Sequence, residues 1–291
     1  MDFSTGTVAS PPMRLASEAV AARGISNHNY GYTLGGQHQQ GTPPPSNPNN
    51  RESRMQRIDF AVENVSVFAG ATETHTDRTT LWGIDDIYGW KAGSSFNPPA
   101  ESSPSAKETS IRRLDYATES WKTPGTVQPE KKYDGAIFSD VPNRKGISIS
   151  GLGGPPHTNT YIKYQMDNDT ITGTPFPAIG PNMSYGSSLQ NPQYGYHAGG
   201  TQVPSPTPSD KSDVYRLDFS SDTYLDTSAN IHRSRHRTGL SAEHYGYFVA
   251  GYYYPSRRSY INKFDFSTET ASPSSDMDAN IANLGSLSNG I

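Results

Sequence analysis

The sequence predicts an all-β protein made of five complete copies of a unit of about fifty residues, followed by an incomplete sixth. Three observations predict this. Glycine and proline total 27 + 23 = 50 of 291 residues, too frequent for long helices but suited to short strands joined by turns. The hydrophobic content is only 32%, yet 18 tyrosines and 10 phenylalanines recur at regular positions, which argues against disorder. Finally, two motifs repeat along the chain with the same period.

The first repeated pattern, the glycine motif, is an aromatic residue, glycine, an aromatic residue, two variable residues, a small residue and glycine. Its aromatic residues are two positions apart, so in a strand they face the same side of the sheet. Glycine permits a close backbone approach or a positive φ, and we therefore assign the motif to packing. The copies are YGYTLGG from Tyr30, YGWKAGS from Tyr88, the degraded KGISISG from Lys145, YGYHAGG from Tyr194 and YGYFVAG from Tyr245.

The second pattern, the aspartate motif, has the same period as the first. Two independent motifs with one period indicate a true repeat rather than chance similarity. Counted from this motif, the units span residues 1–57, 58–113, 114–163, 164–216, 217–263 and, in part, 264–291. The copies are MDFSTGT from Met1, IDFAVEN from Ile58, LDYATES from Leu114, LDFSSDT from Leu217, FDFSTET from Phe264 and the weaker YQMDNDT from Tyr164.

Each unit is expected to contain four short strands. The first precedes the glycine motif, as in RGISN from Arg23 and TGLSA from Thr238, and the second carries that motif. The third leads into the aspartate motif with alternating apolar and polar residues, as in DVYRLDF from Asp213. A tight turn such as SSD or STE, whose polar side chains bond to nearby amides, then leads to a short fourth strand.

Four strands in a unit of this length match the blades of a β-propeller, and the order of the motifs resembles the kelch repeat. That repeat has an apolar-aromatic strand ending in Gly-Gly and then a Tyr-Asp strand. The resemblance covers nearly the whole chain, although the tryptophan common in the fourth kelch strand is present only as Trp121. The units are most similar to kelch-like proteins encoded by marine cyanobacterial phages. The resemblance implies a single kelch-like β-propeller over residues 1–291 and, in such phages, a place in the particle, often its tail.

The loops after the glycine motif differ from unit to unit, whereas the hairpins after the aspartate motif are short and alike. In a four-stranded blade these variable loops leave from one face together with the connectors between blades. Variable loops on a constant scaffold are where repeat proteins place binding surfaces. The alternative is that they are solvated spacers. The loops are residues 37–52, 94–108, 155–159 and 201–211.

Candidate binding residues lie in two segments rich in arginine and tyrosine. The run HRSRHR from His232 offers bidentate arginine donors for an anionic surface, although a solvated or salt-bridging loop explains it as well. Arg23 and Arg237 each match the structural arginine that precedes the first strand in kelch repeats. In GYYYPSRRSY, exposed aromatic rings flanked by arginine suit stacking on sugars. The binding residues predicted are Arg233, Arg235, Arg237, Tyr252, Tyr253, Tyr254, Arg257 and Arg258.

The sequence indicates no catalytic residues and no cofactor. It has no cysteine, which excludes disulfides, thiolate nucleophiles and the cysteine-dependent copper oxidases of kelch type. Its eight histidines show no metal-ligand spacing. Asp167 with Asp169, and Asp276 with Asp278, alternate as in calcium loops but lack the glycine and distal glutamate, so turns explain them better and calcium stays an unsupported alternative.

These observations predict a non-enzymatic structural or assembly protein that contacts other subunits of a homo- or hetero-oligomer through its loop face, and the resemblance to phage proteins implies a virion component such as part of a tail or fibre. The alternative is a module that binds a carbohydrate or a host receptor. The net charge of −4 favours no nucleic acid or anionic membrane, and no apolar segment has the length of a membrane helix or signal peptide. A virion or extracellular location is expected.

The two ends of the chain divide a sixth unit. Met1 opens in an aspartate motif, and NLGSLSNGI near the end resembles a first strand, so the termini are expected to share a blade that lacks its second strand. Three outcomes are open: a longer chain, which we favour, a strand donated by another subunit, or a five-bladed ring with frayed ends.

Overall fold

A computed structural model describes fourteen stretches of the chain, and they contain strands and turns but no helix. The all-β prediction is confirmed for these residues. They are residues 19–20, 23–34, 37–38, 55–62, 64–68, 80–83, 87–95, 107–125, 135–149, 161–172, 183–202, 209–253, 256–274 and 276–277.

Five four-stranded antiparallel sheets form the body of the structure, and in each the strands pair in chain order. The first comprises β2 (Arg23–Ser26), β3 (Tyr30–Leu34), β5 (Met55–Asp59) and β6 (Asn64–Phe68). The second comprises β7 (Thr80–Gly83), β8 (Tyr88–Ser95), β9 (Lys107–Asp115) and β10 (Ser120–Lys122). The third comprises β11 (Ala136–Asp140), β12 (Lys145–Ile149), β13 (Tyr161–Gln165) and β14 (Thr170–Thr172).

The fourth sheet comprises β16 (Ser187–Gln190), β17 (Tyr194–Ala198), β20 (Asp213–Asp218) and β21 (Tyr224–Asn230). The fifth comprises β22 (Thr238–Ser241), β23 (Tyr245–Tyr253), β24 (Ser256–Asp265) and β25 (Thr270–Pro273). Two smaller groups pair separately: β15 (Met183–Ser184) with β18 (Thr201–Gln202) and β19 (Ser209–Asp210), and β1 (Ala19–Val20) with β4 (Gln37–His38). The predicted order of first strand, glycine motif, aspartate motif and fourth strand is therefore confirmed.

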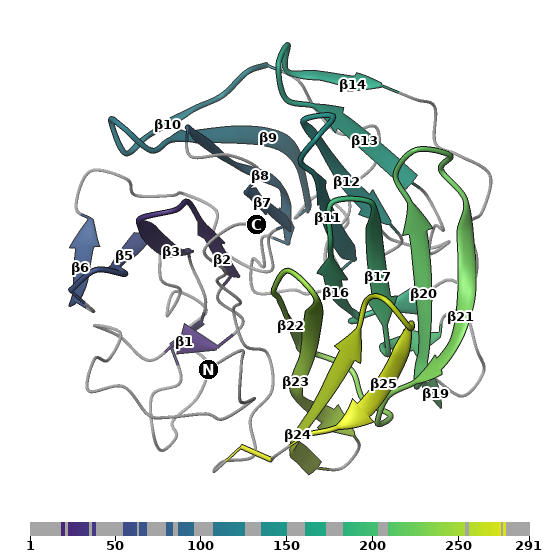
Figure 1. Ribbon diagram of the computed structural model, residues 1–291. Coiled ribbons are helices and arrows are strands. Elements are labelled where there is room, and N and C mark those ends of the chain that lie inside the picture. Colours follow the sequence, from purple (N-terminus) through teal and green to yellow (C-terminus); the bar gives the residue numbers. More distant parts are fainter. Residues whose placement is uncertain are drawn as a thin grey trace.

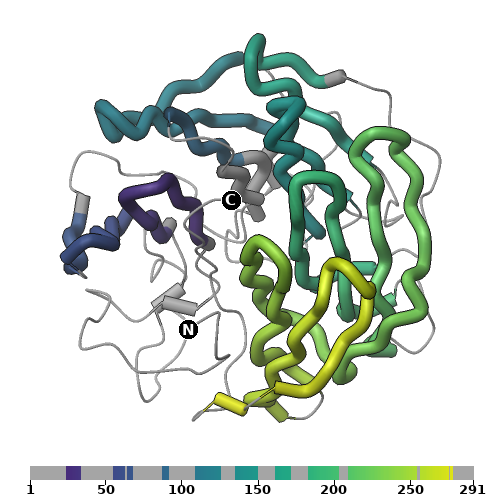
Figure 2. Tube along the Cα trace, in the orientation of Figure 1, coloured from purple at the N-terminus to yellow at the C-terminus, as the bar shows by residue number. Residues whose placement is uncertain are grey.

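The five sheets follow one another around a central axis in chain order (Figure 1). Their first strands pack against each other near that axis, β2 on β7, β7 on β11, β11 on β16 and β16 on β22. No comparable packing joins β22 to β2, both of which are described. The tube view shows the same arrangement, with the first and fifth sheets at the two ends of the series (Figure 2). The architecture is consistent with a β-propeller-like fold.

The sheets begin at the strand before the glycine motif, so the units counted from the aspartate motif combine parts of two sheets. Residues 58–113, for example, start at the end of β5 and finish within β9. In the second to fifth sheets the aspartate motif lies at the boundary with the preceding sheet, because its apolar residues pack against that sheet. Leu114 and Tyr116 pack on Tyr32, and Phe264 and Phe266 on Tyr196, in buried clusters.

In the second, fourth and fifth sheets, the first glycine of the motif makes room for a side chain from the preceding sheet. A Cβ placed on Gly195 would lie 2.5 Å from the ring of Phe138, and one on Gly246 would lie 2.3 Å from Leu189. Both neighbours belong to the first strand of the preceding sheet. The predicted close approach is therefore present, and it is an approach between sheets.

The final glycine of the motif has the second predicted property. Gly200 has φ +89°, and a Cβ there would meet the carbonyl oxygen of Ser184 at 2.6 Å. A side chain at this position is excluded by both backbone conformation and space. Gly36, the equivalent residue of the first unit, lies outside the described residues.

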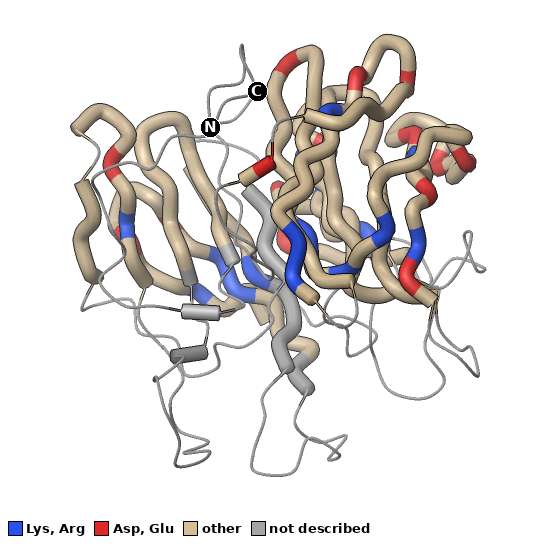
Figure 3. Tube along the Cα trace, turned by 90° about the horizontal axis from the view of Figure 1, so that it is seen from below, with Lys and Arg blue, Asp and Glu red and all other residues tan. Residues whose placement is uncertain are grey.

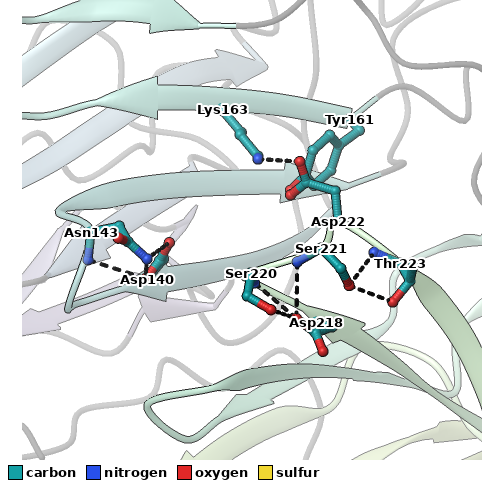
Figure 4. Close-up of polar contacts among 9 residues, drawn as sticks. All are labelled: Asp140, Asn143, Tyr161, Lys163, Asp218, Ser220, Ser221, Asp222 and Thr223. Atoms are coloured by element: carbon teal, nitrogen blue, oxygen red, sulfur yellow. Dashed lines mark hydrogen bonds and ion pairs between the residues drawn. The ribbon is translucent and has the colours of Figure 1, made fainter.

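The turn between the third and fourth strands is held by the aspartate that names the motif. The Asp218 carboxylate accepts hydrogen bonds from the amides of Ser220 and Ser221 at 2.8 and 3.1 Å. It also accepts one from the Ser220 hydroxyl, and this bond together with the amide bonds lowers the pKa of Asp218. Asp115 and Asp265 make the same amide bonds. The predicted polar turns are confirmed in these units, and Figure 4 shows the one at Asp218.

Candidate functional site

The fifth sheet carries the longest hairpin of the described structure. Strands β23 and β24 continue past an irregularity between Val249 and Gly251, where Ala250 has φ 58° and Gly251 has φ 130°. A bulge of this kind bends a strand and changes the direction of the residues beyond it. Tyr252 and Tyr253 therefore lie on an extension of the sheet at its loop end.

The connector that precedes β22 is attached to this extension. The backbones of Arg235 and Tyr252 exchange hydrogen bonds of 3.0 and 2.8 Å, and the Arg235 guanidinium lies over the Tyr252 ring at 5.1 Å from its centroid. Arg235 also lies 3.9 Å from the carboxylate of Asp210. The two segments that the sequence singled out are thus neighbours, joined through Arg235 and Tyr252.

The remaining aromatic residues of the extension are paired with cationic side chains. Arg258 lies 5.8 Å from the Tyr253 ring and 5.9 Å from the Tyr260 ring, and His232 stacks on Tyr260 at 4.2 Å. Cation–π pairing keeps the ring and the guanidinium together in water. Tyr253 is 39% exposed.

Arg237 is placed differently from its neighbours, because it is buried. Its guanidinium donates to Ser234 Oγ and, at 3.0 Å, to Asn262 Oδ1, and burial lowers its pKa to about 10. It fixes the connector to the sheet and is not presented at the surface. Tyr254 lies outside the described residues.

We call the surface that remains the arginine–tyrosine cluster. It combines exposed Arg233 and Arg257 with partly exposed Arg235, Tyr252 and Arg258 and with Tyr253. Guanidinium groups donate bidentate hydrogen bonds to carboxylates or phosphates, and exposed tyrosine rings stack on planar or sugar groups. The cluster is therefore suited to binding and contains no nucleophile paired with a base.

A second set of polar residues joins each sheet to the next. In each of the four interfaces, a carboxylate in the turn of one sheet accepts a hydrogen bond from a cation on the third strand of the preceding sheet. We call this the carboxylate contact. The pairs are Arg57–Glu119 at 2.9 Å, Arg113–Asp169 at 3.0 Å, Lys163–Asp222 at 2.5 Å and Arg216–Glu269 at 2.7 Å.

Each of these carboxylates also accepts a hydrogen bond from a tyrosine hydroxyl. Figure 4 shows Asp222 with both Lys163 and Tyr161, the latter at 2.7 Å. Burial and the neighbouring carboxylate raise the tyrosine pKa, so the phenol stays a neutral donor. The acceptor residue always has positive φ, between 49° and 58°. Sequence reasoning missed this contact, although its signal was present: an Arg or Lys directly precedes each aspartate motif from Ile58 onward, and the sixth residue of those motifs is acidic.

Many of the acidic residues lie at the end of the sheets that carries these turns (Figure 3). The arginine–tyrosine cluster lies at the opposite, loop end of the fifth sheet, because β23 runs from its turn at Tyr245 to Tyr253. The variable loops that were predicted to bind lie largely outside the described residues. These loops are residues 37–52, 94–108, 155–159 and 201–211.

No group of three His, Asp or Glu side chains suited to a metal is found in the described part of the chain. Asp167 bonds to Arg144, and Asp169 to Arg113 and Tyr164, so this acidic pair serves ion pairing. Asp278 lies outside the residues that the structure describes. None of the described elements is a helix of the length and hydrophobicity that crosses a membrane.

No protein-family model matches this sequence, and no curated protein shows a significant match to it.

Proposed function

We propose that the chain is a kelch-like β-propeller that acts without catalysis, as an assembly protein whose loop end contacts neighbouring subunits. The arginine–tyrosine cluster carries this proposal. It presents several guanidinium groups held by stacking and backbone bonds on one extended hairpin, and arginine and tyrosine are the residues enriched where proteins bind one another.

The distribution of charge supports contact between copies of the chain. The turn end is rich in carboxylates, and the loop end of the fifth sheet is rich in arginine (Figure 3). Opposite charges on opposite ends favour head-to-tail association between copies of the chain. Such an interface forms a ring where the rotation between copies closes, and an open filament where it does not. In the phage setting that the sequence resembles, such a contact belongs to an assembled particle.

Sedimentation velocity over a concentration series tests this proposal. We expect reversible self-association that weakens as salt is raised, because exposed charges are screened. Arg257→Glu reverses one exposed charge of the cluster and should weaken association about 5- to 10-fold, as rim charges do. Lys122→Glu reverses an exposed charge on the fourth strand of the second sheet and is the matched control. A monomer at all concentrations, or equal effects of the two variants, contradicts the proposal.

The second candidate function is carbohydrate binding, favoured by the exposed ring of Tyr253 beside Arg258. A glycan array with the purified chain distinguishes the two. Saturable binding to one class of sugar, lost in Tyr253→Ala and kept in Lys122→Glu, favours the carbohydrate function over self-association.

A further inference from the structure

Arg237 is a buried cation that has no counter-ion among the described residues. It is 6% exposed, and none of the ion pairs found in the described part of the chain includes it. Its guanidinium bonds there only to neutral groups: the Ser234 hydroxyl, Asn262 Oδ1 at 3.0 Å and the Phe248 carbonyl at 3.5 Å. Burial lowers its pKa to about 10, so the group still carries its charge at neutral pH. An unpaired buried charge is costly, and a counter-ion is therefore expected.

One nitrogen of this guanidinium has no acceptor in the described structure. Nη2 of Arg237 is shielded from solvent, and no described residue accepts a hydrogen bond from it. The hydroxyls of Ser184 and Ser187 are likewise buried and without a partner among the described residues. These serines flank Tyr185, whose carbonyl accepts a hydrogen bond of 2.8 Å from the amide of His236, the residue before Arg237. Buried donors are normally satisfied, so an acceptor is missing at this boundary between the fourth and fifth sheets.

This arrangement differs from that of the two preceding sheets. The residue directly before the first strand is Arg237 in the fifth sheet, but it is glycine before β11 and before β16. The position of Asn262 on the third strand is taken by Ile162 in the third sheet and by Tyr215 in the fourth. A pair needed only to hold a sheet together would recur in sheets of the same design. The buried pair of Arg237 and Asn262 therefore has a role of its own.

We propose that a small monovalent anion, such as chloride, binds at Arg237 Nη2. The site is closed, because Arg237 and Ser234 are almost fully buried, and a single guanidinium neutralises one charge. A halide suits such a site better than phosphate, which takes several donors at once. Arg233 and Arg235 lie on the same connector and raise the local concentration of anions. The bound anion fixes the connector and, with it, the position of Arg235 in the arginine–tyrosine cluster.

Thermal unfolding at constant ionic strength tests the proposal. We expect the Tm to rise by about 2–5 °C when sodium gluconate is replaced by sodium chloride at about 0.3 M total salt, because an ion that binds only the folded chain stabilises it. Sodium bromide should act as chloride does. A dilute sample that sediments as a monomer keeps this result separate from self-association. An unchanged Tm in chloride and bromide overturns the proposal and assigns the position to water.

A carboxylate supplied by the chain should replace the ion. Asn262→Asp places an acid at the atom that accepts the 3.0 Å hydrogen bond from Arg237. The rise in Tm with chloride should then fall below about half of its wild-type value, because the guanidinium is already neutralised. Arg237→Met should abolish the rise whatever its own stability. Arg233→Met, which removes an exposed arginine of the same connector, is the matched control and should keep it. A full rise in Asn262→Asp, or an equal loss in Arg233→Met, overturns the proposal.

Anomalous scattering from bromide locates the ion. Crystals of the full chain in sodium bromide should show an anomalous peak at hydrogen-bonding distance from Arg237 Nη2, and the peak should be absent in Asn262→Asp. Peaks confined to exposed arginines such as Arg233 and Arg257 would mean an adventitious ion only, and would overturn the site. The result is independent of the proposed self-association, because the buried ion contacts no second copy of the chain.

Discussion

The interface between the fourth and fifth sheets and the interface between the third and fourth make the same carboxylate contact with different residues. In the former, Glu269 accepts from Tyr196 of β17 and Arg216 of β20, two residues that are paired across neighbouring strands. In the latter, Ile147 occupies the position of that tyrosine, and Asp222 accepts the hydroxyl of Tyr161 from β13 instead.

The difference shows which part of the contact is constant. In every described interface a cation lies on the third strand of one sheet and an acid lies in the turn of the following sheet. The strand that carries the tyrosine hydroxyl differs between interfaces. Tyr161 and Lys163 are two positions apart on one strand and therefore share a face, which is why the substitution works. The charge pair defines the contact, and the hydroxyl completes the hydrogen bonds of a partly buried carboxylate.

Removal of the aromatic ring should have the largest effect. Tyr196→Ala is expected to lower the free energy of unfolding by about 3–5 kcal/mol, because the fully buried ring packs on Phe264 and Phe266. Tyr196→Phe, which keeps the ring, should cost only about 1–2 kcal/mol for the lost hydroxyl. Denaturant unfolding measures both, and equal losses would show that packing contributes little here.

Acid should destabilise the fourth sheet selectively. His197 is fully buried, with its Nδ1 3.1 Å from the Tyr224 hydroxyl, and burial lowers its pKa to about 4. The unfolded chain binds the proton first, so the stability from neutral His197 is complete above about pH 6.5 and is lost as pH falls towards 4. The loss should be on the order of 3 kcal/mol.

Unfolding curves at pH 7 and pH 4.5 measure this loss, with His197→Gln as the comparison. The third sheet has Ser148 at the equivalent position and supplies no such titration. If the stability of His197→Gln falls between pH 7 and pH 4.5 as much as that of the wild type, groups other than His197 are responsible.

A double-mutant cycle compares the charge pairs of the two interfaces. Arg216→Met with Glu269→Gln, and Lys163→Met with Asp222→Asn, should each give a coupling of about 1 kcal/mol, because the pairs are partly exposed. Both couplings should shrink in 1 M salt. A coupling in one interface only would mean that the two contacts are not equivalent.

The smallest effect is expected in the turn itself. Asp218→Ala removes an acceptor for two amides and should cost about 0.5–1.5 kcal/mol. In the third sheet Gln165 stands at this position and bonds to the carbonyl of Asn143, so Gln165→Ala should cost less than about 0.5 kcal/mol. Chemical denaturation of the two variants side by side tests the difference.

The sequence predicted the strands because their signals are local: alternation, glycine and the turn aspartate each act within one unit. Trp90 and Tyr196 were assigned to packing for the same reason, and both are fully buried. The carboxylate contact joins residues 53 to 62 positions apart, such as Arg216 with Glu269 and Arg57 with Glu119. No local pattern states that the acid of one unit meets the cation of the unit before it.

The arginine–tyrosine cluster was predicted in part for a similar reason. Both segments were identified from composition, but the burial of Arg237 depends on Ser234 and Asn262, and the latter is on a strand far along the chain. Arg235 is partly exposed and Arg237, two residues further on, is buried against the bulge at Gly251. A Cβ on Gly251 would lie 2.8 Å from the Arg237 side chain, so the two positions are fitted to each other.

The glycine that receives a side chain from the preceding sheet also bears on how such a chain changes in evolution. Phe138 fits against Gly195 and Leu189 against Gly246, so the receiving position is the same while the inserted side chain differs. A unit duplicated within the gene would bring a complete set of both positions with it. Its neighbours would meet surfaces they already fit, and selection would then act on the loops alone.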